Sequence, residues 1–152
     1  MWPIKTRARN FAKEDVAAIK RTGVILLQDE FVMHDGIAFG GLSSGLINRG
    51  GMPSLAWLAD FCGSGTPRVL LCHHPEYYEK YLKNLPIDLI VSGHAHGGQW
   101  RFFGRGVFAP GQGLFPKYTA GVHDDRLVVS TGLKTSRLPR FFNEPEIVFI
   151  EV

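Results

Sequence analysis

The stretch D-L-I-V-S-G-H-A-H-G-G-Q, residues 88–99, joins a short apolar run to a glycine-rich turn that carries two histidines. A short apolar run that ends near a glycine, as residues 88–91 do, is typical of a buried strand. His94 and His96 follow this run two residues apart, so their imidazoles can reach adjacent metal ions. Two solvated histidines on a polar loop are the alternative. The strand followed by glycines favours metal ligands, and the stretch therefore predicts a metal site at the end of a buried strand.

A second apolar run, residues 68–72, also ends in histidines, because His73 and His74 follow it directly. Strands that end in polar side chains bring them to one edge of an α/β sheet, where sites usually form. We therefore expect His73 to lie near His94 and His96. For His74 three roles stay open: it orients a ligand, donates to a phosphate oxygen, or faces water. The remaining histidines stand next to aspartates in turn-like contexts and are predicted to be surface residues: His34 and His123.

The rest of the chain mixes strand and helix patterns. Asp35 and Gly36 between two apolar runs predict a β-hairpin with a type I′ turn. Residues 97–121 are rich in Gly, Pro and aromatics and predict a long functional loop. Such a mixture indicates an α/β or α+β layered fold rather than a purely parallel sheet. The expected helices are 11–22, 54–61 and 75–82, and the expected strands are 24–27, 31–34, 37–39, 68–72, 88–91, 126–129 and 146–150.

Composition limits the function classes. A chain of 152 residues with 45% apolar and 20% charged residues fits one globular domain. The formal net charge of +3, with no dense basic stripe, argues against nucleic acid as a partner. The sequence contains neither an apolar run long enough to span a membrane nor a signal peptide, so a cytoplasmic location is predicted. Cys62 and Cys72 lack the C-x-x-C spacing and are expected to be free thiols.

Three motifs, in this order, resemble the calcineurin-like metallophosphoesterases, and most closely the bacterial branch with G-H-x-H-G-G-Q. They are V-L-L-C-H-H-P-E at 69–76, G-H-A-H-G-G-Q at 93–99 and S-R-L-P-R-F-F-N-E-P-E-I at 136–147. The resemblance runs from about Asp15 to the end of the chain. It implies the C-terminal part of a four-layer αββα sandwich with mixed β-sheets.

The same resemblance implies functional roles for single residues. His73 and His94 match ligands of a second metal, His96 matches a ligand of the first, and His74 is the candidate catalytic residue. Two divalent ions, Mn, Fe, Zn or Ni, would then support hydrolysis of phosphomonoesters, phosphodiesters or pyrophosphates. The expected substrates are phosphorylated small molecules or lipid-linked compounds, with peripheral contact to a membrane. Arg101 and Arg105 are among the candidates to bind phosphate, with surface solvation as the alternative.

The chain departs from the family in one large respect. The family's N-terminal motifs D-x-H, G-D-x-x-D and G-N-H-[DE] do not occur in these 152 residues. We therefore expect residues 1–152 to be a single, incomplete domain whose N-terminal half lies on the same or another chain, and we expect weak metal binding by this chain alone. Two alternatives stay open. One is a catalytically inactive truncated or scaffold module of the same fold, and the other is a mononuclear site made by His73, His94 and His96.

Overall fold

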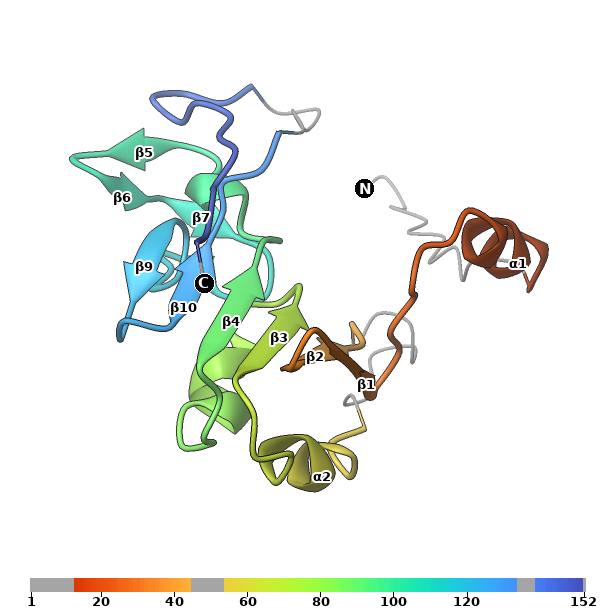
Figure 1. Cartoon of the computed structure of the whole chain (residues 1–152). Coiled ribbons are helices and arrows are strands. Elements are labelled where there is room, and N and C mark those ends of the chain that lie inside the picture. The colour runs from red at the N-terminus through yellow and green to blue at the C-terminus, as the bar shows by residue number, and fades with distance from the viewer. Residues whose placement is uncertain (1–12, 45–53, 134–138, 152) are drawn as a thin grey trace.

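The central feature of the computed structural model, which describes residues 13–44, 54–133 and 139–151, is a six-stranded sheet. Its strands lie in the order β1-β2-β3-β4-β10-β9 (Figure 1). The predicted mixed α/β class is confirmed. The strand bounds are β1 Glu30–His34, β2 Ile37–Leu42, β3 Arg68–Cys72, β4 Leu89–Ser92, β9 Gly121–His123 and β10 Leu127–Val129.

Parallel pairing at the centre of the sheet decides where the site forms. β2 pairs with β3, β3 with β4 and β4 with β10 in parallel, while β1 and β9 pair antiparallel at the two edges. The hairpin β1–β2 turns at Asp35 and Gly36, whose φ angles of 46° and 78° agree with the predicted type I′ turn. The carboxyl ends of β2, β3 and β4 therefore meet at one edge of the sheet.

One face of this sheet is covered by two short helical segments. They are α2, Leu58–Cys62, and the π-helical turn η1, Tyr78–Leu82. α2 overlaps the predicted helix 54–61 but begins four residues later and ends one residue later, and η1 falls within the predicted helix 75–82. Their side chains and every second residue of the central strands form the core, in which the most deeply buried members are Phe61, Leu70, Leu82, Ile90, Leu127 and Val129.

The opposite face of the sheet is partly bare. Leu71 of β3 remains 48% exposed and Val122 of β9 remains 64% exposed. The prediction of a strand at 24–27 is wrong, because this segment is extended but pairs with no strand of the described chain, and Ile25 is 63% exposed. The predicted strand 146–150 is wrong for the same reason, with Phe149 88% exposed. Apolar residues alone do not make a strand, since a strand needs a neighbour for its backbone groups.

Only one large sheet occurs in the described part of the chain, so the second large sheet of the expected sandwich is not seen there.

The helix α1, Lys13–Arg21, is confirmed and stands apart from the sheet (Figure 1). No helix among the described residues is long and apolar enough to cross a membrane. Cys62 and Cys72 are free, as predicted.

The predicted loop 97–121 contains regular structure. It forms two small hairpins. We use the name hairpin lobe for these two hairpins together with residues 139–143, which lie beside them. A backbone bridge joins Trp100 to Phe141 and so holds the two parts together. The hairpins are preceded by the 3₁₀ turn η2 His96–Gly98. They consist of the strands β5 Arg101–Phe102, β6 Arg105–Gly106, β7 Phe108–Ala109 and β8 Gly113–Leu114.

Candidate metal centre

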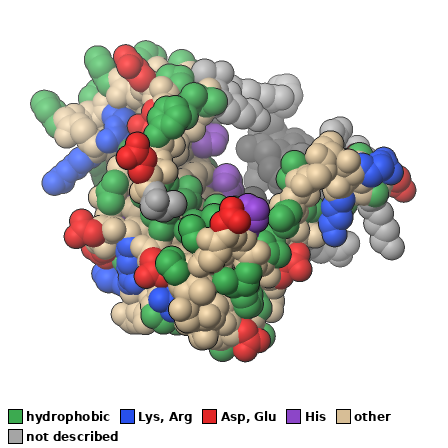
Figure 2. Space-filling view, in the orientation of Figure 1, with side chains coloured by type: hydrophobic (Ala, Val, Ile, Leu, Met, Phe, Trp, Pro, Cys, Tyr) green, Lys and Arg blue, Asp and Glu red, His purple; other side chains and the backbone are tan. Residues whose placement is uncertain are grey.

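Histidines from two neighbouring strands meet at the carboxyl edge of the sheet. His73 and His74 follow β3, and His94 follows β4, which pairs with β3 in parallel. Nδ1 of His94 lies 3.2 Å from Nε2 of His73, and the ring centroids of His74 and His94 are 4.2 Å apart. The expected approach of His73 to His94 is therefore found. Figure 2 shows histidine side chains in the hollow between the main body and the arm that carries α1.

A carboxylate belongs to this group. The metal-ligating atoms of His74, Glu76 and His94 all lie within 4.8 Å of one another. Nδ1 of His74 lies 3.0 Å from Oε1 of Glu76, and the two side chains are only 7% and 11% exposed. The second carboxylate oxygen of Glu76, Oε2, is buried and has no hydrogen-bond partner in the structure. A buried oxygen without a donor, beside two imidazoles, fits a cation.

His74 is fixed from both sides. Its Nδ1 contacts the carboxylate of Glu76, and its Nε2 lies 2.6 Å from Oγ of Ser44. Because a carboxylate only accepts, the pairing assigns the proton to Nδ1, and Nε2 then accepts from the Ser44 hydroxyl. Ser44 stands two residues after the end of β2, so a third parallel strand contributes to the same edge.

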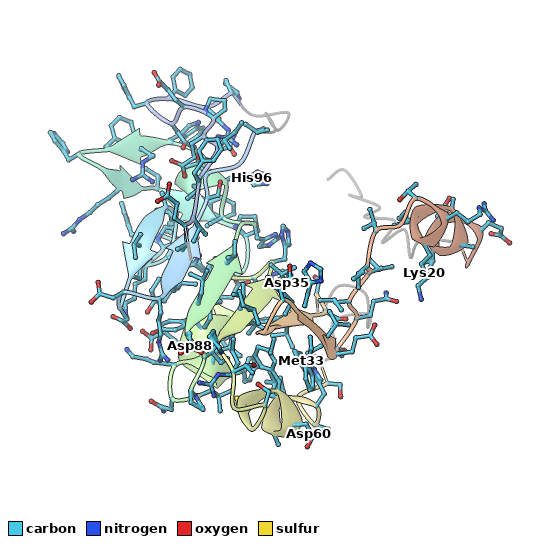
Figure 3. All side chains as sticks on the ribbon, viewed as in Figure 1. Lys20, Met33, Asp35, Asp60, Asp88 and His96 are labelled. Atoms are coloured by element: carbon cyan, nitrogen blue, oxygen red, sulfur yellow. The ribbon has the colours of Figure 1, made fainter. Side chains whose placement is uncertain are left out.

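His96 lies outside this compact group. Its charge is felt by His73 and His94, but His96 is not among the residues whose ligand atoms cluster within 4.8 Å. In Figure 3, where it is labelled, His96 lies towards the hairpin lobe. The assignment of His96, with His73 and His94, to two metals stays a prediction. Both His94 and His96 have positive φ angles, 54° and 49°, a backbone conformation that is uncommon for residues with a Cβ and that concentrates at functional sites.

The glycines after His96 are required by close contacts. A Cβ added to Gly97 would lie 2.0 Å from Oδ1 of Asn143, and one added to Gly98 would lie 2.3 Å from Cα of Gly106. The amide of Asn143 donates to the carbonyls of His96 at 2.6 Å and Gln99 at 3.1 Å. The turn is thus fastened to residues 139–143 of the hairpin lobe, and no larger residue would fit.

The environment favours the neutral imidazoles of His73 and His94. Burial, together with the neighbouring His74 and His73, lowers the pKa of His94 to about 4. Burial also lowers the pKa of His73, and the neighbouring His74 and His96 lower it further. For Glu76, burial acts to raise the pKa, but the hydrogen bond with His74, a backbone hydrogen bond and the charges of His74 and His94 together outweigh it, and the net shift is downward. Neutral imidazoles next to an ionised carboxylate are the protonation states in which these groups bind divalent metals.

Three residues of this centre were not predicted from the sequence. Glu76 stands inside the H-H-P-E motif, so its position two residues after His74 was a visible signal. Ser44 gave no local signal, and Asn143 stands in the motif at 136–147, which marked the segment but not the residue's role, because each reaches the centre from a distant part of the chain. His34 is an exposed residue as predicted, whereas His123 is half-buried and its Nε2 lies 3.1 Å from the carbonyl of Ala120.

Comparison with known proteins gives partial matches to metallophosphoesterases. The chain is 38% identical over 85 residues to the uncharacterized metallophosphoesterase YkuE of Bacillus subtilis, and 35% identical over 91 residues to the UDP-2,3-diacylglucosamine pyrophosphatase LpxG of Chlamydia muridarum. It is also 38% identical over 79 residues to the uncharacterized protein YpbG of Bacillus subtilis.

These matches cover 51–53% of this chain and only 27–28% of each relative, so the chain spans little more than a quarter of the proteins it resembles. No family model and no solved structure matches the chain. Over about half of its length the chain is thus similar to part of a metallophosphoesterase and to part of a pyrophosphatase, and its histidine–glutamate group is a candidate site for a divalent metal.

Proposed function

We propose that this chain provides the histidine side of a metallophosphoesterase centre of the calcineurin-like family, which hydrolyses phosphate esters or pyrophosphates. The observation that carries the proposal is the approach of His73, His74, Glu76 and His94 at the carboxyl edge of parallel strands. The names of two relatives, a metallophosphoesterase and a pyrophosphatase, support it. The substrate is a phosphorylated small molecule or a lipid-linked compound.

Two sets of ligands are compatible with the proposal. In the first, which follows the resemblance, His73 and His94 bind one ion and His96 binds another. In the second, which follows the shortest distances, His74, Glu76 and His94 bind one ion. Imidazole together with carboxylate suits Mn, Fe, Zn or Ni better than Mg alone. When bound, the metal supplies Lewis-acid stabilisation of a phosphoryl oxygen.

The chain's own residues have separate tasks under this proposal. Glu76 holds the proton of His74 at Nδ1, which leaves Nε2 directed to Ser44. If substrate displaces the Ser44 hydroxyl, Nε2 of His74 is free to accept a proton from the attacking water, and the imidazolium so formed can donate that proton to the oxygen of the leaving group. His74 is therefore our candidate for proton transfer in the first ligand set, with Glu76 as its positioning residue. In the second ligand set Glu76 binds the metal ion instead.

We also propose that ligands from outside these 152 residues complete the centre, either on the same chain or on another one. Three aspects support this proposal: the half-exposed face of the sheet, the unpaired apolar segments around Ile25 and Phe149, and the short share of each relative that the chain matches. Without a bridging aspartate two ions are not held at the roughly 3.5–4 Å that two-metal hydrolysis uses. Slow turnover by this chain alone is therefore expected.

Metal binding tests the proposal directly. Titration calorimetry with Mn²⁺ should give measurable binding that His94→Ala weakens roughly 10–100-fold. His34→Ala, an exposed histidine outside the group, is the matched control and should bind like the parent. Equal binding by the parent and His94→Ala would overturn the proposal.

Two further variants separate the ligand sets. Glu76→Gln should weaken Mn²⁺ binding if His74, Glu76 and His94 share an ion, whereas His96→Ala should weaken it if the resemblance assigns the ligands correctly. Hydrolysis of a chromogenic phosphodiester should be measured in parallel. Metal binding without any hydrolysis, even after addition of a segment that carries D-x-H and G-N-H-[DE], would favour the scaffold alternative.

A further inference from the structure

The hairpin lobe exposes aromatic side chains at the tips of its turns. Phe103 is fully exposed and occupies the turn between β5 and β6, where its φ of 49° and the φ of 78° at Gly104 give a tight two-residue turn. Phe115 follows β8 and is 79% exposed, and Phe142 is 83% exposed. Large apolar side chains that gather in water mark a surface that contacts a partner or a membrane.

These aromatic residues come from segments that lie side by side. The rings of Phe102 and Phe142 have centroids 6.1 Å apart, and those of Trp100 and Phe141 are 6.3 Å apart. The backbone amide of Val107, directly before β7, donates to the carbonyl of Trp100, directly before β5, which ties the second hairpin to the first. Phe115 lines the same pocket as Gly104 and Arg105 of the first hairpin. In Figure 2 hydrophobic side chains gather over the part of the molecule where β5 and β6 lie. Exposed aromatic residues of three segments thus lie close together in the lobe.

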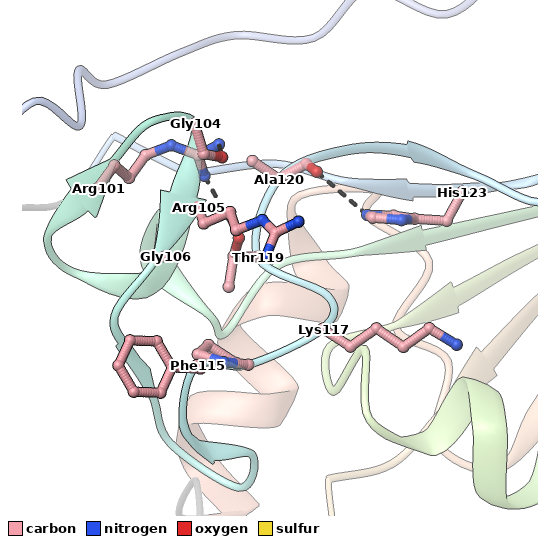
Figure 4. Close-up of a pocket in the computed structure, with 10 residues that line it drawn as sticks. Arg101, Gly104, Arg105, Gly106, Phe115, Lys117, Thr119, Ala120 and His123 are labelled. Carbon is pink, nitrogen blue, oxygen red and sulfur yellow. Dashed lines mark hydrogen bonds between the residues drawn. The ribbon is translucent and has the colours of Figure 1, made fainter.

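A basic pocket opens next to these aromatic tips (Figure 4). It has a volume of about 490 Å³, and no carboxylate belongs to its lining. Its lining includes, among others, Arg101, Arg105, Phe115, Lys117, Thr119 and His123.

Among the cations that line this pocket, Arg105 is the one whose guanidinium we expect to bind a ligand. The guanidinium of Arg101 is held by the carbonyls of Gly97 and Gly104 and by the hydroxyl of Thr119. Lys117 pairs with Glu79, and this hydrogen bond raises the pKa of the lysine. Arg105 is exposed and makes no ion pair with any residue in the described ranges. Figure 4 shows its side chain extending over Thr119.

We propose that the hairpin lobe binds the surface of an anionic phospholipid membrane. Phe103, Phe115 and Phe142 enter the boundary between head groups and acyl chains, and Arg105 contacts lipid phosphate. Separate aromatic tips next to a cation suit a fluid interface, because each ring can insert on its own, and aromatic side chains favour this depth. A folded protein partner would need a larger matching surface. The proposal does not depend on metal binding or hydrolysis.

Co-sedimentation with lipid vesicles tests this inference. The chain should sediment with vesicles of phosphatidylcholine and phosphatidylglycerol, and binding should fall as salt is raised. Phe103→Ser should lower the partition coefficient roughly tenfold, because one exposed ring no longer leaves water. Arg105→Gln should lower it roughly fivefold for anionic vesicles only. Phe149→Ser, an equally exposed phenylalanine outside the lobe, is the matched control and should leave binding unchanged.

Several results would overturn the proposal. They are an absence of binding by the parent chain, equal binding to pure phosphatidylcholine vesicles, and unchanged binding by Phe103→Ser. Inhibition by free glycerol phosphate in the same concentration range would assign the pocket to a soluble phosphate ligand instead. Loss of self-association by Phe103→Ser in the absence of lipid would assign the surface to contact between copies. Circular dichroism of each variant checks that the fold is retained, which is expected because these side chains are exposed.

Discussion

In the central sheet Leu70 and Ile90 are fully buried, whereas in the hairpin lobe Phe103 is fully exposed and Phe115 is 79% exposed. The sheet is held by apolar burial under α2 and η1. The lobe keeps its shape largely through polar side chains that bond to backbone groups. Gln112, for example, exchanges hydrogen bonds with both the amide and the carbonyl of Tyr118. The most exposed phenylalanines of the lobe, Phe103, Phe115 and Phe142, bury little surface, so we expect them to contribute little to folding.

The largest expected effect comes from truncating the core of the sheet. Ile90→Ala should lower the free energy of unfolding by about 2–5 kcal/mol, because it leaves a cavity beneath α2 and η1. Denaturant unfolding followed by circular dichroism measures this change. Val91→Ala, the next residue on the half-exposed face, is the matched control and should cost about 1 kcal/mol. Equal losses for the two variants would mean that the two faces are equally packed.

A smaller effect is expected from releasing the histidine turn. Asn143→Ala removes donors from the carbonyls of His96 and Gln99 and should cost about 1–3 kcal/mol. Amide hydrogen exchange should speed up in the hairpin lobe while the strands of the sheet stay protected. Asn84→Ala, at an exposed position after η1, should change neither property. A loss of protection in both regions would show that lobe and sheet unfold as one unit.

The smallest expected effect is a pH dependence at the histidine edge, measured in the presence of a chelator. The pKa of His94 falls from 6.5 to about 4 on folding, so the unfolded chain binds more protons between these values. The free energy of unfolding should therefore decrease as pH falls from about 6.5 to about 4. The decrease should stay below about 1 kcal/mol, because water screens a half-exposed ring. His94→Ala should flatten the curve, and an unchanged slope would contradict the assignment.

Local sequence patterns were sufficient where a segment has its partners nearby or carries a continuous apolar run. The Asp35–Gly36 turn and residues 68–72 were predicted correctly, since a turn depends on two residues and a central strand on its own apolar run. The apolar segments 24–27 and 146–150 were predicted as strands and are not, because pairing depends on a neighbour that the pattern does not contain. The small hairpins within 97–121 were missed, since each strand has only two residues.

By itself the sequence determined the class of chemistry: histidines at the ends of two apolar strands, with glycines after one of them. Only the tertiary structure decided which groups meet. It brought Ser44 and Glu76 to His74, left an oxygen of Glu76 without a donor, and placed His96 away from the closest group. The physical reason is that the register of parallel strands and long-range hydrogen bonds, such as that of Asn143, set distances that spacing along the chain cannot encode.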